Sequence, residues 1–454
     1  MAKVSNEYLP ISVLGTFPSD WQEATLASVC HQVTDGTHDS PKPVAEGGYP
    51  LVTGKAIKDR RINFAVTYNI SRDEHQKVID RSKPERDDIL FANIGNSIGD
   101  LVRVETNQPF SIKNVALFKP DQSKIHPRYL EYFLLSEKVQ GFIKGATRGS
   151  AQPFIGLSSL RGFPIAVPPM EEQYNIGMLL GAFDDRITLL RETNATLEAI
   201  AQALFKSWFV DFDPVRAKME GRVPESMDEA AAALFPDGLE DSELGAVPTG
   251  WRVRRLGDVS SYLSRGISPK YLEDGGVLVL NQKCIRDFSV DYCKGRRHDS
   301  SQRKIEGRQV ATGDVLVNST GVGTLGRVAQ VLSLPEAAVI VDSHVTIVRP
   351  SPNLSWPYLG QFMMRKQPDI EAMGEGSTGQ TELSRSKLAD VLILVPPEDV
   401  LVAFDQFVIP MKQRISLNES GMQNMAKLRD TLLPGLISGQ LRLPAAEEKI
   451  QLAA

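Results

Sequence analysis

Several short motifs have residue types that could support catalysis or cofactor binding, but each lacks a necessary part. Gly321, Gly323 and Gly326 follow a strand-like run with the spacing of a dinucleotide-binding loop. The next residues, RVAQVLSLPEAAVIVD, are typical of a hairpin, whereas the motif requires a helix there. The tract GYPLVTGKA (48–56) has five residues between its glycines, and alanine where a phosphate-binding loop needs serine or threonine. Neither tract predicts nucleotide binding.

The remaining chemical candidates are a cysteine with two histidines and two proline pairs. Cys30, His31 and His38 have poor spacing for zinc, and a fourth thiolate is missing. Pro168-Pro169 and Pro396-Pro397 lack the flanking Asn or Asp and the aromatic residue that amino-methyltransferases use. We therefore expect no catalytic residue and no metal site, because no nuclease, ATPase or methyltransferase constellation is complete.

Length and composition describe an ordinary folded protein. The chain has 454 residues, of which 42% are hydrophobic, and this length suggests two to three domains. Three cysteines are too few for a disulfide framework. No apolar run approaches the roughly 18 residues that a membrane span needs. The first residues lack the apolar core of a signal peptide. We expect a cytoplasmic protein.

The net charge of −5 is unevenly distributed along the chain. Residues 220–243 carry eight acids and one base, whereas residues 251–310 carry thirteen Lys or Arg and seven acids. A basic region beside an acidic one is compatible with a polyanionic partner. On charge alone, a solvated charged surface explains the pattern equally well.

The chain repeats itself at an offset of 226–230 residues. Leu14-Gly15 with Trp21 returns as Leu244-Gly245 with Trp251, and SIKNVALFKP (111–120) returns as VDSHVTIVRP (341–350). Each half has short alternating runs broken by Gly, Pro, Asn and Asp, followed by a long helical segment. The repeat predicts two strand-rich modules, each followed by a helix. Trp21 and Trp251 are expected to be core anchors.

The two helical segments carry a heptad pattern, in which apolar residues advance by alternating steps of four and three. This spacing averages 3.5 residues and predicts a coiled-coil seam. Each seam contains one asparagine, a residue that fixes register at some cost in stability. The seam positions are Ile176, Leu180, Phe183, Ile187, Leu190, Asn194, Leu197 and Leu204 in the first helix, and Val408, Met411, Ile415, Asn418, Met422, Met425 and Leu432 in the second.

Antiparallel pairing of the two helices predicts a rod with one module at each end and a pseudo-two-fold axis. The alternative is that each helix packs only on its own module. Pro410 and Pro434 predict that the second helix is kinked near its ends or starts late. Asp184-Asp185 lies in the first helix and is more typical of a solvated face than of a metal site.

The predicted fold class is α+β, with two strand-rich domains separated by two long helices paired as an antiparallel coiled coil. The acidic segment is either a tether or a docked helix, because MDEAAAALF (227–235) favours a helix. The predicted divisions are module 1 (1–167), a central helix (168–212), the acidic linker (213–243), module 2 (244–395), a distal helix (396–441) and a C-terminal tail (442–454).

These features resemble the specificity subunit of type I restriction-modification enzymes over nearly the whole chain. Residues 163–215 look like the central conserved region of that family, and LADVLILVPP (388–397) with LRDTLLPGLISGQL (428–441) look like its distal one. Asp35-Gly36-Thr37-His38 is also typical of its recognition modules, as are the loops GATRGSAQ (145–152) and GEGSTGQ (374–380). One departure is Glu398-Asp399, where the first half has Glu172-Gln173.

The resemblance implies a non-catalytic DNA-recognition subunit. Each module would be a target recognition domain that reads one half of an asymmetric, bipartite site in double-stranded DNA. The paired helices would act as a spacer and dock two methyltransferase (modification) subunits, and restriction or motor subunits would join the full complex. This chain would bind no cofactor, while S-adenosylmethionine, ATP and Mg would belong to partner subunits. The alternatives are a stand-alone DNA methyltransferase or nuclease of unusual type, and a bridging scaffold without a DNA role.

Base readout uses Arg or Lys for guanine and Asn or Gln for adenine, and cations also contact phosphates. Each candidate could equally be an exposed polar residue that contacts no DNA. The loop-borne candidates are His38, Lys42, Lys55, Lys58, Arg60, Arg61, Arg148 and Gln152 in module 1, and Arg265, Lys270, Lys283, Arg286, Arg296, Arg297 and Gln380 in module 2.

Overall fold

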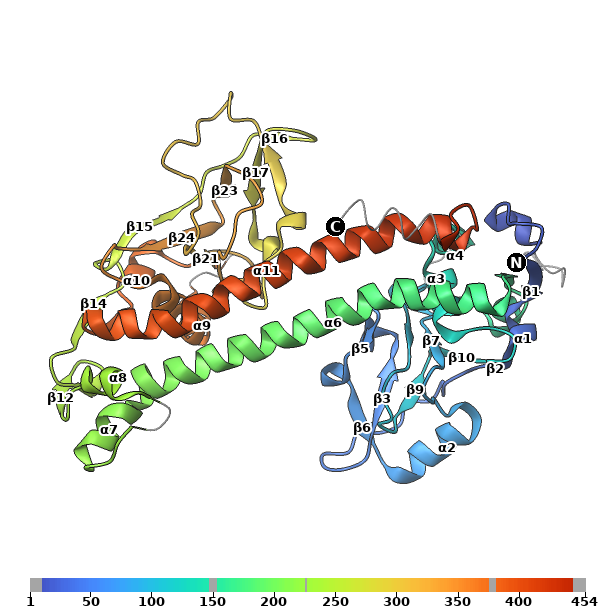
Figure 1. Cartoon of the computed structure of the whole chain (residues 1–454), viewed down its shortest axis with the longest axis horizontal. Helices are drawn as coiled ribbons and strands as arrows, with labels where there is room; N and C mark the ends of the chain where they lie inside the picture. The colour runs from blue at the N-terminus through green and yellow to red at the C-terminus, as the bar shows by residue number, and fades with distance from the viewer. Residues whose placement is uncertain (1–9, 147–152, 225–226, 375–380, 444–454) are drawn as a thin grey trace. The chain divides into compact units, whose positions relative to one another are not determined.

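A computed structural model describes residues 10–146, 153–224, 227–374 and 381–443 (Figure 1). The chain divides into two compact units. Unit 1 comprises Met1–Leu189 with Gly421–Ala454, and unit 2 comprises Leu190–Ser420. Each unit therefore contains one strand-rich module and parts of both long helices.

Unit 1 is built on two small sheets and two strand pairs. The first sheet is antiparallel, in the order β2 (Cys30–Asp35), β10 (Ala116–Pro120), β7 (Ile89–Phe91), β8 (Leu101–Arg103). The second has the order β6 (Tyr68–Ile70), β3 (Tyr49–Thr53), β9 (Ser111–Lys113), and β3 and β9 are parallel. β1 (Gln22–Thr25) pairs with β11 (Pro164–Val167), and β4 (Ile57–Lys58) with β5 (Arg61–Ile62). The helices of the module are α1 (Leu26–Val29), α2 (Arg72–Ser82), α3 (Pro127–Leu135), α4 (Glu137–Ala146) and α5 (Leu157–Arg161), with short turns η1 (Ile11–Leu14), η2 (Gly54–Ala56), η3 (Phe64–Val66) and η4 (Gly95–Ser97).

Unit 2 repeats this topology with one added strand, β16. One sheet has the order β15 (Ser260–Arg265), β24 (Val345–Pro350), β21 (Val315–Asn318), β22 (Val328–Gln330). The other has the order β16 (Tyr271–Leu272), β20 (Arg296–His298), β17 (Val277–Leu280), β23 (Val339–Val341), with β17 and β23 parallel. β14 (Arg252–Arg255) pairs with β25 (Leu392–Val395), and β18 (Ile285–Arg286) with β19 (Ser289–Val290). The helices of the module are α9 (Trp356–Ala372) and α10 (Arg385–Ala389), with short turns η6 (Gln282–Cys284) and η7 (Tyr292–Lys294).

Matching aromatic residues organise the core of each module. In unit 1 the buried Trp21 packs edge-on against Tyr129, whose hydroxyl donates to the carbonyl of Ala166 at 2.7 Å. In unit 2 Tyr358 likewise donates to the carbonyl of Leu394, and Trp251 is buried in the same core. Both tryptophans therefore serve as core anchors, as expected.

Two long helices follow the modules at the same offset. α6 (Met170–Lys206) continues through a π-helical turn, η5 (Ser207–Asp211), and α11 spans Glu398–Ile437. The expectation of a late start for α11 is wrong, because its first turns bury Leu401, Phe404 and Val408 upstream of Pro410. Pro410 is exposed. Core burial in these turns outweighs the hydrogen bond that one proline removes.

Within each unit the segments of α6 and α11 pair antiparallel. In unit 1, Ile176 and Leu180 share a core with Leu432 and Leu436, and Asp184 pairs with Arg429. In unit 2, Asn194 accepts from Asn418 Nδ2 at 2.7 Å, and Glu198 pairs with Lys412 at 2.6 Å. The residue numbers of the α11 partners fall as the residue numbers along α6 rise, so the paired segments run in opposite directions. The predicted α+β fold class with antiparallel helices is thereby confirmed.

The acidic segment is docked on unit 2 rather than being a free tether. Its elements are α7 (Asp213–Met219), α8 (Glu229–Ala233) and the strand pair β12 (Leu239–Ser242) with β13 (Gly245–Pro248). Phe235 is buried, and its ring lies edge-on to Trp208 with centroids 5.1 Å apart. The acids in the described part of the segment are exposed, so apolar burial attaches the segment.

In the described part of the chain, helices that are both long and apolar enough for a membrane span are absent.

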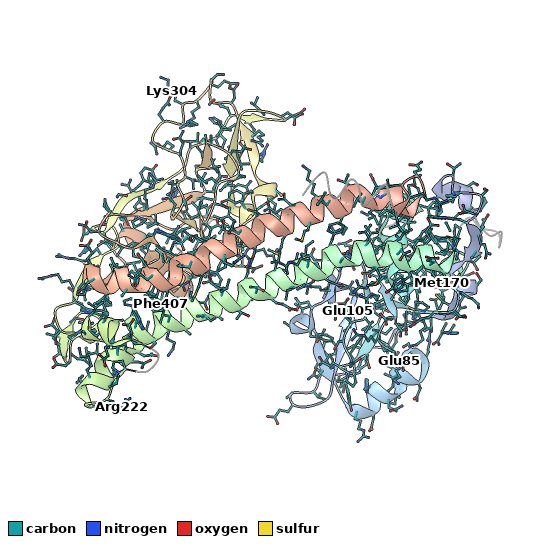
Figure 2. All side chains as sticks on the ribbon, viewed as in Figure 1. Glu85, Glu105, Met170, Arg222, Lys304 and Phe407 are labelled. Atoms are coloured by element: carbon teal, nitrogen blue, oxygen red, sulfur yellow. The ribbon has the colours of Figure 1, made fainter. Side chains whose placement is uncertain are left out.

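Substitution of two phenylalanines on α11 tests whether the buried face of this helix stabilises the fold. Phe404 is fully buried, whereas Phe407 is 44% exposed (Figure 2). Phe404→Ala is expected to lower the free energy of unfolding by about 3–5 kcal/mol, because it leaves a cavity in a packed core. Phe407→Ala serves as the matched control and should cost about 1 kcal/mol or less. Urea unfolding of both variants measures the difference, and equal losses would contradict this packing.

Candidate nucleic-acid interface

Each module has a short turn followed by a hairpin whose two strands are two residues long, at the same place in its fold. In module 1 these are η2 and β4–β5, and in module 2 they are η6 and β18–β19. The hairpin turns match in backbone conformation, because φ is positive at Asp59 (49°) and Arg60 (59°), and at Asp287 (50°) and Phe288 (60°). Two consecutive positive φ values are typical of a type I′ turn, which suits the twist of paired strands.

The hairpins bring several predicted DNA-contact residues together on exposed surface. Lys55 and Lys58 are exposed in module 1, and Lys283 and Arg286 are exposed at the equivalent positions of module 2. Arg61 is also exposed, and its guanidinium donates to Thr188 Oγ1 at 2.8 Å. An exposed cation on a narrow hairpin can reach a phosphate or a base edge without unfolding its module.

Arg60, by contrast, belongs to an internal ion cluster of unit 1. Its guanidinium donates to Glu131 Oε1 at 2.8 Å, pairs with Asp184, and lies 4.7 Å from the centroid of the Tyr132 ring. Burial disfavours the cation, but the charges of Glu131 and Asp184 raise the pKa of Arg60 above its ordinary value. In this arrangement Arg60 fixes the hairpin against α3 and α6, and DNA contact by Arg60 stays a prediction.

Asp184 is the central acid of this cluster. It accepts from the Tyr132 hydroxyl and pairs with both Arg60 and Arg429. Burial alone would raise its pKa, but the charges of the two arginines and the tyrosine hydrogen bond hold the pKa of Asp184 below its ordinary value. The expectation of a solvated face is wrong for Asp184, whose side chain is 22% exposed, and fits Asp185, which is 55% exposed.

In module 2 further predicted residues lie on or beside two sheets. The Arg296 guanidinium stacks over Tyr271, with its central carbon 3.4 Å from the ring centroid, and Arg297 pairs with Glu336 at 2.5 Å. The Lys270 backbone nitrogen donates to the buried His298 at 3.0 Å, and the Lys270 side chain is exposed. Arg265 lies on the other sheet, where it pairs with Glu382. The structure therefore gathers Lys270, Arg296 and Arg297 on one sheet and separates Arg265 from them.

The remaining predicted residues are dispersed or lie outside the described part. His38 contacts Asn114 Oδ1 at 2.9 Å and lies 3.1 Å from a carboxylate oxygen of Asp35. Lys42 is exposed. Arg148, Gln152 and Gln380 lie outside the described residues.

Sequence reasoning missed two kinds of residue here. Lys304, at the outer tip of module 2, is exposed but was not among the candidates (Figure 2). The local excess of Lys and Arg in 251–310 was the signal for it. The buried Glu131 was also missed, because its neighbours Arg60 and Arg103 are far from it in sequence. The heptad steps of the second helix also pass through Arg429, between Met425 and Leu432, and a charge at such a position was a signal for a buried acidic partner.

The Arg60 cluster gives a prediction about stability. Arg60→Ala leaves the buried Glu131 carboxylate and the half-buried Asp184 carboxylate without the cation that they share. We expect it to lower the free energy of unfolding by about 3 kcal/mol. Arg61→Ala is the matched control and should change it by less than about 1 kcal/mol. Denaturant unfolding at neutral pH compares them. Similar small losses in both variants would mean that the cluster does not fix the hairpin.

Asp184 gives a prediction about pH. Because its folded pKa is lowered, its contribution to stability is complete above the ordinary Asp pKa of about 3.9 and is lost as the pH falls through the folded value. Asp184→Asn should therefore destabilise the protein at pH 7, and its difference from wild type should shrink below about pH 4. Asp185→Asn is the control. A difference that grows in acid would contradict the ion-pair assignment.

Comparisons with known proteins agree with this architecture. Residues 18–199 match the family described as the type I restriction modification DNA specificity domain. The chain is 23% identical to the type I restriction enzyme HindI specificity subunit of Haemophilus influenzae, over 93% of this chain and 100% of the relative. It is 25% identical to the type I restriction enzyme MjaIX specificity subunit of Methanocaldococcus jannaschii, over 95% of each. A solved S subunit of a type I restriction-modification system from M. genitalium shares the fold, with a TM-score of 0.55 and 16% identity over 92% of this chain and 96% of that chain. Residues 18–199 thus match the type I restriction modification DNA specificity domain, and the chain is similar to type I restriction enzyme specificity subunits over most of its length.

Proposed function

We propose that this chain is the DNA sequence-recognition subunit of a type I restriction-modification complex, and that each module reads one half of a bipartite site. The observation that carries the proposal is the repeated hairpin. Two modules of the same topology present exposed cations at equivalent positions, Lys55 with Lys58 and Lys283 with Arg286. A reader duplicated in one chain is suited to two separate half-sites.

The two half-sites are expected to differ in sequence. Residues 31–43 and 261–272 contain most of the first strand of equivalent sheets and the segment after it, yet they share little sequence. Phosphate contacts orient a protein on DNA, whereas base contacts decide its sequence preference. The shared hairpin cations are suited to the first task, and the residues that differ between modules to the second. An asymmetric target follows from this division.

The long helices offer apolar surface for partner subunits. Tyr174 and Met178 on α6 in unit 1 are 51% and 41% exposed, and Ile200, Phe407 and Leu417 in unit 2 are 45%, 44% and 65% exposed. Tyr174 and Met178 lie one helical turn apart, and exposed apolar residues grouped in this way are suited to contact with a partner. We assign this surface to two modification (methyltransferase) subunits, with restriction or motor subunits joining the full complex. In this proposal the chain itself is not catalytic, and S-adenosylmethionine, ATP and Mg are bound by its partners.

Genome-wide detection of methylated bases by single-molecule sequencing tests the function. A host that carries this gene with an active modification subunit is compared with the same host lacking only this gene. We expect a methylated motif of two short, different half-sites around a fixed unread gap. If no motif depends on this gene while the modification subunit is expressed and active, sequence recognition by the chain is wrong.

The hairpin cations predict a change in salt dependence. Lys55→Ala/Lys58→Ala, or Lys283→Ala/Arg286→Ala, should reduce the slope of log affinity against log salt by about two, because two phosphate contacts are lost. Binding of the assembled complex to its methylated-motif duplex is measured across a salt series. Lys77→Ala/Lys83→Ala is the matched control, because both lysines are exposed in unit 1 and pair with local acids. A slope equal to that of the control would remove the hairpins from the interface.

A further inference from the structure

The two long helices are equivalent by position but not by charge. β11 and β25, and the first residues of α6 and α11, are each separated by 228 residues. At this offset Asp184 corresponds to Lys412, Asn194 to Met422, and Glu198 to Ala426. The same offset relates Leu190 to Asn418 and Ala201 to Arg429. Each of these polar residues on one helix therefore corresponds to an apolar or oppositely charged residue on the other.

Polar side-chain pairs join the helices, and three of them each use one residue from each half of the sequence. Asp184 pairs with Arg429 in unit 1. In unit 2 Asn418 donates to Asn194 at 2.7 Å, and Lys412 pairs with Glu198 at 2.6 Å. Lys412 is only 3% exposed and Glu198 is 24% exposed, so neither charge can turn fully into water. Gln361 on α9 also donates to Glu198, at 2.8 Å.

Pairing of α6 with a second α6 would break all three matches. The offset places Asp184 of one helix opposite Glu198 of the other, and Asn194 opposite Leu190. Two carboxylates would then face each other, and an amide would lose its partner. The two-fold symmetry of such a pair would impose each mismatch twice.

Pairing of α11 with a second α11 would also be mismatched, but with two cations facing each other in place of two carboxylates. Lys412 would lie opposite Arg429, and Asn418 opposite Met422. Partly buried like charges and unpaired amides disfavour an interface strongly, and such repulsion is an efficient source of specificity.

We propose that these residues form a pairing code, in which the helix of one half accepts the helix of the other half and rejects its own kind. The code consists of Asp184, Asn194 and Glu198 on α6 with Arg429, Asn418 and Lys412 on α11. The partner that fits α6 is α11, from the same chain or from a second copy. Its consequence is that one copy each of module 1 and module 2 occurs in every helix pair. The code does not depend on DNA binding.

The test uses the full chain with a protease site inserted after Val223, which is 74% exposed. The cut protein is unfolded in urea and refolded by dilution, so that N-terminal (N) and C-terminal (C) halves can choose partners. Native mass spectrometry then measures N:C, N:N and C:C pairs. Random pairing of equal amounts gives one half N:C, whereas the code predicts almost only N:C. A near-random mixture from the wild-type chain would overturn the proposal.

Charge reversals give the sharper outcome, because they predict which homopair gains. In the Glu198→Lys variant, the new cation faces Lys412 in an N:C pair but Asp184 in an N:N pair. The ratio of N:N to N:C pairs should therefore rise at least about tenfold. In the Lys412→Glu variant, the new carboxylate faces Glu198 in an N:C pair but Arg429 in a C:C pair. The ratio of C:C to N:C pairs should rise instead. General weakening of the helix pair would raise both homopairs alike, and that result would overturn the code.

Two further variants keep the test decisive. Glu192→Lys makes the same charge change at an exposed position of α6, and it should behave as wild type. If Glu198→Lys prevents refolding, Glu198→Gln removes the repulsion from N:N without adding a cation. Glu198→Gln should also raise the ratio of N:N to N:C pairs, but by a smaller factor than Glu198→Lys. No rise in N:N relative to Glu192→Lys would overturn the proposal.

Discussion

The hydrophobic core of each module is closed by a helix that the other half of the sequence supplies. In unit 1, Leu432 and Leu436 of α11 share a core with Trp21 and Tyr129. In unit 2, Phe205 and Trp208 at the end of α6 share a core with Trp251 and Tyr358. Each buried side chain of this size contributes about 1.5–3 kcal/mol. The modules and the helix pair therefore depend on one another for stability, and the repeat is structurally complete only when both halves are present.

Charged groups have a different role from this apolar burial. An exposed ion pair contributes about 0–1 kcal/mol, and a buried one offsets much of its attraction with desolvation. The ions around Asp184 and Glu198 therefore contribute less to stability than to position, because they fix which residues of the two helices lie opposite each other. In unit 1 the same cluster includes Arg60 and so holds the β4–β5 hairpin. The equivalent Phe288 is 41% exposed, so the two hairpins are held by different means.

Much of the fold could be predicted because the sequence contains two periodic patterns, the internal repeat and the heptad spacing. The offset repeat predicted two strand-rich modules, and the strand orders β2-β10-β7-β8 and β15-β24-β21-β22 correspond between the two units. Heptad spacing predicted the helix pair. The candidate site was harder to predict, because a loop arginine has no local pattern that separates a DNA contact from an internal ion pair. Arg60 shows this limit, since its partners Glu131 and Asp184 are distant in sequence. A late start of α11 was one of the two outcomes expected from Pro410 and Pro434, and it was wrong because tertiary burial decides where this helix begins.

The most direct test of the account is hydrogen–deuterium exchange on the chain truncated after Ser420. This truncation removes only the residues of α11 and the C-terminal segment that belong to unit 1. The account predicts that amides around Trp21 and Tyr129 lose protection, because their core is opened, while unit 2 amides around Tyr358 keep most of theirs. Unchanged protection in module 1 would contradict the claim that each module is completed by a helix from the other half.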